Sequence, residues 1–181
     1  MEISYGLEGV VVDTTAISLV DGANGVLSYR GHRVDDLLDY SFGEVAELVV
    51  DGATGTTLAG QLHAASSLSE RELAMVLALP ADTHPMHLLQ GLTPLLDKDS
   101  SFAARGDAAQ GFAVAAKLPT LLATFHLGAP APSSATIDPA RRFLEQIGAP
   151  LTDIAVEAYN TNRKMFSRPC LPTILPIWWP G

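Results

Sequence analysis

Cysteine is nearly absent from this sequence of 181 residues, in which Cys170 is the single example. One cysteine cannot form an intramolecular disulfide, and it excludes a CxxC metal or redox motif. Charged residues make up only 17% of the chain, and 20 acidic residues against 11 basic ones give a formal net charge of -9. A chain of this charge is repelled by phosphates, and no basic stripe with interleaved aromatic residues offsets the repulsion. The composition therefore excludes nucleic acid and anionic membranes as partners.

Long apolar runs are also missing, since none reaches the length of a membrane span. Residues 1–4 lack the basic and apolar regions of a secretory signal and the arginine-rich pattern of a transit peptide. The reduced cysteine usage points to a reducing compartment. These features predict a soluble, cytoplasmic protein.

What the sequence has in abundance is apolar residues, which make up 48% of the chain and give a positive mean hydropathy of +0.22. This proportion argues against disorder, and 181 residues suffice to bury a core without disulfides or structural metals. We therefore expect one domain. Because polar residues are few, part of its apolar surface is expected to need a partner.

Strand patterns are confined to residues 8–31. Apolar and β-branched residues cluster at 10–12, at 17–20 and at 26–29, and the last two clusters flank the sequence Gly-Ala-Asn-Gly. Asn24 and Gly25 accept positive φ readily, so this pattern predicts a β-hairpin with a two-residue turn at these positions. Because Ser28 alternates with apolar residues, as do Arg30 and His32, we expect the polar residues on the solvated face.

Helical patterns follow the hairpin. Ser41 with Glu44, and Ser69 with Glu72, have the spacing of a capping box. The predicted helices cover 33–40, 42–52, 69–80, a segment from about 85 to 96 that Gly91 and Pro94 weaken, 107–127 with a proline at 119, 138–148 and 152–160. The fold class predicted from these segments is mainly α with a small amino-terminal β-hairpin.

Each helical segment has an apolar face that we expect to be buried. The faces are Phe42, Val45, Ala46 and Val49; Leu73, Val76 and Leu77; Met86, Leu89, Leu92 and Leu96; Phe112, Ala115, Ala116, Leu122 and Phe125; Ala140, Phe143, Leu144 and Ile147; and Ile154, Ala155 and Ala158.

Residues 163–181 differ in composition from the rest of the chain. They contain both tryptophans, the cysteine and four prolines, but no acidic residue and no alanine. The prolines recur too closely for a helix, and the segment is too apolar for an ordinary disordered tail. We therefore divide the chain into residues 1–162 and an anomalous apolar tail, 163–181, for which a reading-frame change or an aberrant end is one hypothesis.

Histidines are the first candidates for chemistry. His84 and His87 are three residues apart, which places both on one helical face, with Asp82 as the only nearby carboxylate. Zinc sites in proteins use three or four protein ligands, so two histidines more often lie at the surface or cap a helix. His63 and His126 fall in apolar helical segments, where they are expected at the boundary of the core.

A cationic cluster of Arg30, His32 and Arg33 ends the predicted hairpin. It could hold an anion, but a solvated hairpin end explains it equally well. Residues 52–57 resemble a phosphate loop superficially, yet they lack the lysine and follow a helix rather than a strand, so we interpret them as an ordinary loop. Cys170 has no neighbouring base, and no serine lies in a GxSxG sequence, so neither supports a nucleophile.

Several longer segments resemble one family. They are GLEGVVVDTTAISLVDGANGVLSYRGHRVDDLL at the amino terminus, SFGEVAELVVDG, HPMHLLQGLTPLL and AAKLPTLLATFHLG, with a weaker likeness over 138–161. They resemble the amino-terminal half of citrate synthases and 2-methylcitrate synthases. The resemblance covers roughly the first 160 residues and implies the amino-terminal part of a large helical domain.

The resemblance also implies a reaction, the condensation of acetyl-CoA with oxaloacetate. In the family, an aspartate removes a proton from the acetyl methyl group, one histidine stabilises the enol and another polarises the oxaloacetate carbonyl. The histidines belong to DHG.NAST and HGG segments, and the aspartate and most coenzyme A contacts to later sequence. Here Asn162-Arg163-Lys164-Met165 stands where the first motif is expected, and the second does not occur. No catalytic, cofactor-binding or metal-binding residue is therefore assigned, and no bound cofactor is expected.

Two hypotheses follow. In the first, the chain is a truncated citrate synthase-like protein of an acyltransferase family and is inactive alone. In the second, it is a non-catalytic helical module that pairs with itself or with a full-length homologue. The sequence does not distinguish citrate from 2-methylcitrate as the family product.

Overall fold

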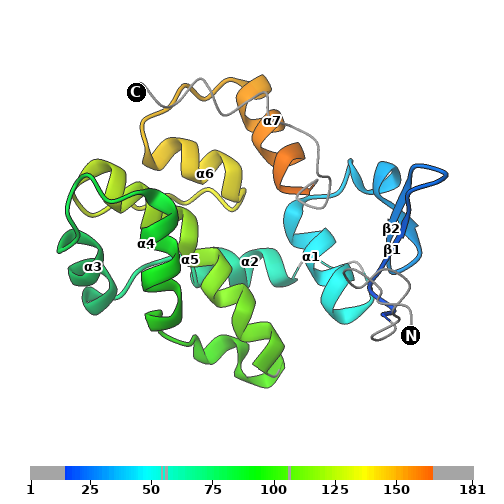
Figure 1. Ribbon diagram of the computed structural model, residues 1–181, viewed down its shortest axis with the longest axis horizontal. Coiled ribbons are helices and arrows are strands. Elements are labelled where there is room, and N and C mark those ends of the chain that lie inside the picture. The colour runs from blue at the N-terminus through cyan, green and yellow to red at the C-terminus, as the bar shows by residue number, and fades with distance from the viewer. Residues whose placement is uncertain (1–14, 54, 56, 106, 165–181) are drawn as a thin grey trace, which may run out of the picture.

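A computed structural model of the chain describes residues 15–53, 55, 57–105 and 107–164. It is mostly helical, with a small antiparallel sheet at one end (Figure 1), so the predicted fold class is confirmed. The strands are β1 (Ser18–Asp21), β2 (Val26–Tyr29) and β3 (His32–Arg33). The α-helices are α1 (Phe42–Asp51), α2 (Thr57–Ala64), α3 (Glu70–Leu77), α4 (Pro85–Leu92), α5 (Asp107–Leu127), α6 (Pro139–Gln146) and α7 (Asp153–Lys164). Three 3-10 helices are η1 (Val34–Leu37), η2 (Thr93–Leu95) and η3 (Ser100–Arg105).

The sheet has the order β1-β2-β3, and its turns differ from the predicted ones. Asp21 pairs with Val26, so four residues connect β1 to β2, and the Asp21 carboxylate accepts a hydrogen bond from the Asn24 backbone N–H at 3.1 Å. Only Gly25 of this turn has a positive φ, 64°. The predicted two-residue turn at Asn24 and Gly25 is therefore wrong, because Asp21 closes a longer loop.

A two-residue turn does occur, one strand later. Tyr29 pairs with His32, and the residues between them, Arg30 and Gly31, have φ values of 49° and 86°. Positive φ at both positions is the geometry that matches the right-handed twist of two antiparallel strands. The expected turn chemistry is therefore present, but it joins β2 to β3.

The faces of the sheet are also not those expected. Ser28 is buried, with 8% of its surface exposed, whereas Leu19 and Val20 are 63% and 73% exposed. On β2, Tyr29 packs against the cluster formed by Leu37, Val45 and Leu48. The prediction that Ser28 faces solvent is wrong, because successive side chains of a strand point to opposite faces and β2 is covered on both, at Ser28 and at Tyr29. The strand expected at 10–12 lies outside the described residues.

Helix starts agree with the prediction. Ser41 and Glu44 form a complete capping box at α1, and Ser69 and Glu72 form another at α3. The Asp138 side chain caps α6, whose first residue is a proline. These signals are local, since a cap needs only residues within one turn of each other.

Four helical segments depart from their predicted extent or face, and the first three are residues 33–40, α4 and α3. Residues 33–40 form only the short η1, and α4 ends at Leu92, before the proline of η2. On α4, Leu88 is fully buried and Met86 is 53% exposed, so the predicted face containing Met86 is wrong at its start. The exposure of Leu77, 42%, likewise contradicts its expected burial on α3.

Helix α7 turns a different side to the molecule from the one predicted. Ile154 is 80% exposed and Ala158 is exposed, whereas Tyr159 stacks on Phe143 of α6 with ring centroids 5.4 Å apart. The predicted apolar face of α7 is therefore wrong, because packing against α6 selects Tyr159.

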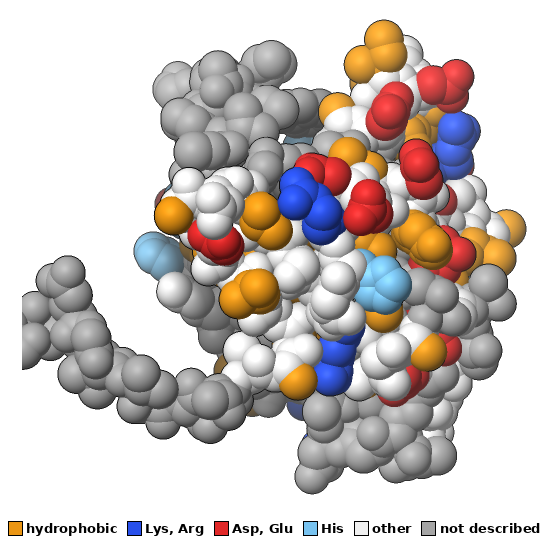
Figure 2. Space-filling model, turned by 90° about the vertical axis from the view of Figure 1, so that its right-hand side faces the viewer, with side chains coloured by type: hydrophobic (Ala, Val, Ile, Leu, Met, Phe, Trp, Pro, Cys, Tyr) orange, Lys and Arg blue, Asp and Glu red, His pale blue; other side chains and the backbone are white. Residues whose placement is uncertain are grey.

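Helix α5 runs through the middle of the helical part, between α2, α4 and α6 (Figure 1). Its Ala113 and Ala116 pack with Leu58, Leu62 and Phe102 in one core cluster, and its Leu121 packs with Val76, Leu88, Leu92 and Leu96 in another. The face shown in Figure 2 carries hydrophobic side chains scattered among carboxylates. Within the described ranges, none of the helices is long and apolar enough to cross a bilayer.

Candidate functional site

Arg142 lies where two cavities meet. It projects from α6, is only 2% exposed and lines both cavities. Its Nη1 lies 2.8 Å from Nδ1 of His63 on α2. Because a guanidinium group only donates, His63 Nδ1 accepts this hydrogen bond and carries no proton. His63 is half-buried, as expected of a core-boundary residue, but no sequence signal marked Arg142 as its partner.

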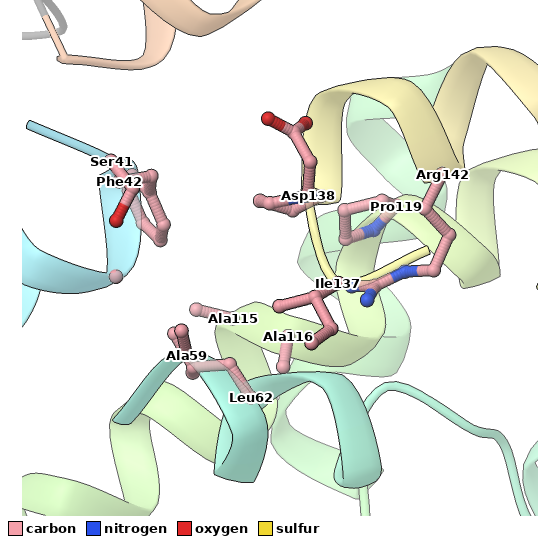
Figure 3. A pocket seen from close by; sticks show the side chains of 12 residues that line it. Ser41, Phe42, Ala59, Leu62, Ala115, Ala116, Pro119, Ile137, Asp138 and Arg142 are labelled. Atoms are coloured by element: carbon pink, nitrogen blue, oxygen red, sulfur yellow. The ribbon is translucent and has the colours of Figure 1, made fainter. Parts of the chain in front are cut away.

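The first cavity, which we call the apolar pocket, has a volume of about 240 Å³ and lies between α1, α2, α5 and α6 (Figure 3). Its walls are mostly apolar, and the polar side chains among its lining residues are Ser41, Asp138 and Arg142. The described residues that line it are Ser41, Phe42, Gly43, Ala59, Leu62, Ala115, Ala116, Pro119, Ile137, Asp138, Pro139 and Arg142.

Asp138 is the only carboxylate among these lining residues, and its oxygens already hold helices together. Oδ1 accepts hydrogen bonds from the backbone N–H groups of Ala140 and Arg141, both at 2.8 Å. Oδ2 accepts one from Asn160 Nδ2 of α7, also at 2.8 Å. With three donors on its two oxygens, this carboxylate serves to cap α6 and to join α6 to α7.

The second cavity, which we call the hydroxyl pocket, has a volume of about 280 Å³ and lies beside the loop 130–134. Serine and threonine side chains dominate its lining, which also includes His63, Arg142 and Gln146. Gln146 is 5% exposed, and its Nε2 donates to Thr120 Oγ1 at 3.4 Å and to the Pro132 carbonyl at 3.3 Å. None of the described residues that line this cavity carries a carboxylate.

A buried ion pair lies apart from both cavities. Lys117 Nζ of α5 is 2.8 Å from Glu72 Oε1 of α3, and the two side chains are 7% and 0% exposed. Glu72 also accepts hydrogen bonds from the backbone N–H groups of Ser69 and Asp97, both at 2.7 Å. With every partner in place, this pair joins α3, α5 and the segment between α4 and α5, which is a structural role.

The histidines singled out in the sequence have different roles. His84 caps α4, because its Nδ1 accepts the backbone N–H of Met86 at 3.2 Å, and its ring lies 5.6 Å from that of His87. Both are exposed, as expected of surface or capping residues. His126 is exposed too, so its expected place at the core boundary is wrong. In the described part of the chain, no three His, Cys, Asp or Glu side chains are grouped to hold a metal ion.

The cationic cluster at the hairpin end is divided between different partners. Arg30 donates from Nε to the Val49 carbonyl at 3.0 Å and from Nη2 to the Val50 carbonyl at 3.4 Å, near the carboxyl end of α1. Arg33 pairs with Asp35 at 3.2 Å, and His32 is exposed. Of the two interpretations, the solvated hairpin end fits this arrangement, because the two arginines point to different groups.

The loop that superficially resembles a phosphate loop lies next to a carboxylate. Glu47 Oε2 accepts the backbone N–H of Leu58 at 3.3 Å, and a Cβ added to Gly55 would come within 2.8 Å of the Glu47 carboxyl group. A buried carboxylate in this place repels a phosphate. Residues 54 and 56 of this loop, and Cys170, lie outside the described residues.

Comparison with known proteins gives one consistent result. Residues 6–162 match the family model described as "Citrate synthase, C-terminal domain". A 2-methylcitrate synthase of Mycobacterium tuberculosis is 39% identical over 133 residues, which cover 67% of this chain and 33% of the relative. A citrate synthase of Mycolicibacterium smegmatis is 39% identical over 134 residues, which cover 67% of this chain and 35% of the relative.

Solved structures agree in fold. The citrate synthase of Thermotoga maritima has a TM-score of 0.73 at 22% identity, and the match covers 88% of this chain and 45% of that one. The citrate synthase of Thermoplasma acidophilum, solved with carboxymethyl coenzyme A and oxaloacetate, has a TM-score of 0.69 at 20% identity, covering 95% and 49%. The chain thus spans about a third of the length of these curated relatives and less than half of these solved chains. With a family model matched over most of its length, the chain belongs to the citrate synthase family.

Proposed function

We propose that this chain is a part of a citrate synthase-type acyltransferase that does not condense acetyl-CoA with oxaloacetate when it is alone. The observation that carries the proposal is the separation of candidate groups between the two cavities. Among the described residues, those that line the apolar pocket include a carboxylate, Asp138, but no histidine, whereas those that line the hydroxyl pocket include a histidine, His63, but no carboxylate.

The family reaction needs both kinds of group on one substrate. Proton abstraction from a thioester methyl group requires a base within hydrogen-bond reach and a donor that stabilises the enolate at the same time. Asp138 is held by three hydrogen bonds, and His63 Nδ1 accepts from Arg142, so neither matches that role. The chain also spans only about a third of the length of its curated relatives, which leaves room for the catalytic groups elsewhere in a complete enzyme.

The test is a thioester assay on the purified chain. Acetyl-CoA or propionyl-CoA is mixed with oxaloacetate, and the loss of thioester absorbance is followed against a blank without protein. This readout is preferable to a thiol reagent because Cys170 would react with the reagent. We expect no rate above the blank with either thioester, and product formation with either one would contradict the proposal. The citrate synthase of Mycolicibacterium smegmatis is the positive control.

A second candidate function is a non-catalytic module that pairs with itself or with a full-length homologue. It is favoured by exposed apolar side chains at both ends of the described chain, Leu19 and Val20 on β1 and Ile154 on α7. Each such side chain gains about 1.5–3 kcal/mol when it is fully buried. If the chain pairs with itself, light scattering should detect species larger than 19.1 kDa. If it pairs with a full-length homologue, it should co-elute with the Mycolicibacterium smegmatis citrate synthase or change the rate of that enzyme.

A further inference from the structure

The apolar pocket has a chemistry that suits a large apolar side chain. An apolar cavity of roughly 150 Å³ is enough to hold a benzene molecule, and this one has a volume of about 240 Å³. Figure 3 shows Ala115, Ala116 and Leu62 at its base and Phe42 and Ile137 at its sides. Ile137 is 57% exposed, so the mouth as well as the interior presents apolar surface.

The segment of this chain that follows α7 carries side chains of that kind. Residues 165–181 contain Leu171, Ile174, Ile177, Trp178 and Trp179 and no acidic residue. Four prolines between 169 and 180 disfavour a helix and favour an extended backbone, which presents single side chains to a pocket.

The end of α7 is close enough to the pocket for this segment to reach it. Asn160, four residues before the last residue of α7, is hydrogen-bonded at 2.8 Å to Asp138, which lines the pocket. Helix α7 also contacts α6 and α1, which form two of the pocket walls. An extended chain spans at most about 3.3 Å per residue, so the ten residues from Lys164 to Ile174 reach up to about 33 Å. The entropy lost on closing so short a loop is small.

Charge favours the same contact. Residues 165–181 hold one of the eleven basic residues, Arg168, and none of the twenty acidic ones, so their formal charge is +1 and that of residues 1–164 is -10. The one cationic side chain among the described residues that line the pocket, Arg142, is only 2% exposed. The acidic body therefore attracts the basic tail, and the apolar pocket selects where it binds.

We propose that residues 165–181 of this chain bind in the apolar pocket between α1, α2, α5 and α6, with the apolar side chains between Ile174 and Trp179 as its occupants. The tail is then a cover for apolar surface on its own molecule. This inference is independent of the proposed function, because it concerns binding within the chain and not catalysis.

Tryptophan fluorescence of the full chain tests it directly, because Trp178 and Trp179 are the only tryptophans in the sequence. We expect emission at shorter wavelength, and weaker quenching by acrylamide, than in the same chain unfolded in guanidinium chloride. Neither quantity should change on dilution. Emission and quenching equal to those of the unfolded chain would overturn the proposal. Protection of the tryptophans from acrylamide that disappears on dilution would also overturn the proposal, since the tryptophans of one copy would then be buried against a second copy.

Two substitutions connect the signal to the pocket. Ala115→Phe fills the cavity from its base, and Ile137→Asp places a charge at its exposed mouth, where the fold tolerates it best. Both should shift the emission to longer wavelength and increase quenching, while far-UV circular dichroism stays unchanged. Met86→Asp is the matched control, because Met86 is 53% exposed on α4 and lines neither pocket. Buried tryptophans that respond to neither pocket substitution, or equally to the control, would show that the tail binds elsewhere.

Discussion

The buried ion pair between Glu72 and Lys117 allows the sharpest test of what stabilises this fold. Replacing Lys117 with methionine keeps an unbranched side chain of similar length but removes the cation. The Glu72 side chain, 0% exposed, then keeps its two backbone donors and loses the ammonium group 2.8 Å away. Leaving one charge of a buried pair without its partner destabilises a protein by about 3–5 kcal/mol. Since a domain is stable by only about 5–15 kcal/mol, Lys117→Met should remove about a fifth or more of the total.

A matched control is available at the same place. Arg71 pairs with Asp97 and also donates to the Leu95 carbonyl at 2.6 Å, but the Arg71 and Asp97 side chains are 55% and 42% exposed. Exposed pairs contribute about 0.2–1 kcal/mol, so Arg71→Met should lower the free energy of unfolding by no more than that. Urea denaturation followed by far-UV circular dichroism measures both variants. If Lys117→Met loses no more than Arg71→Met, the reasoning from burial is wrong.

The same pair predicts how stability depends on pH. Burial of the Glu72 carboxyl raises its pKa, but hydrogen bonds from Lys117, Ser69 and Asp97 outweigh burial and hold the pKa below its ordinary value of 4.5. A carboxyl whose pKa is lower in the folded state contributes fully above the unfolded value, and its contribution is lost as the pH falls through the folded value. The free energy of unfolding of the wild type should therefore fall below about pH 4.5. That of Lys117→Met should fall less over the same pH range, because the ammonium group that favours the charged carboxyl is gone.

Four further substitutions are expected to follow local rules, each measured by urea denaturation. Gly52→Ala should lower the free energy of unfolding by about 1–2 kcal/mol, because Gly52 has a φ of 79°. Gly60→Ala, in open space on α2, should instead raise it by about 0.5–1 kcal/mol. Equal effects of the two substitutions would contradict the assignment of the Gly52 effect to its positive φ. Ser41→Ala removes half of a capping box and should lower stability by about 1 kcal/mol, and no loss would show that water replaces the cap. Phe102→Ala, at a side chain with 0% exposure, should lower it by about 3–5 kcal/mol, and a loss below that of Ser41→Ala would mean that the core collapses around the gap.

The features that could be predicted from the sequence are those decided within a few residues. Ser41 with Glu44 and Asp138 with its following proline mark helix starts correctly, because cap and helix are neighbours in the chain. The hairpin turn shows the limit of prediction from neighbouring residues. Asn24 and Gly25 have the right residue types, but the pairing of Asp21 with Val26 sets the loop length, and pairing depends on the whole sheet.

The candidate site was harder to predict, because its central residues are long polar side chains in buried places. Arg142 and Gln146 are 2% and 5% exposed, yet a periodicity argument assigns such residues to the solvated face of α6. They are buried because α6 packs against α2 and α5, where Arg142 contacts His63 and Gln146 contacts Thr120. Those contacts join segments 79 and 26 residues apart in the chain.

Charged residues at helix ends connect the local and the long-range parts of this fold. Glu72 completes the capping box of α3 and also binds Lys117 of α5. Asp138 caps α6 and also binds Asn160 of α7. A residue that satisfies its own helix and a second element at once should be worth more than a simple cap. Asp138→Ala should therefore lower stability by more than the ~1 kcal/mol of Ser41→Ala, and should also detach α7. Amide hydrogen exchange measures this separately, since faster exchange is expected in α7 as well as in the first turn of α6. Unchanged exchange in α7 would mean that its other contacts, such as the stacking of Tyr159 on Phe143, hold the helix in place.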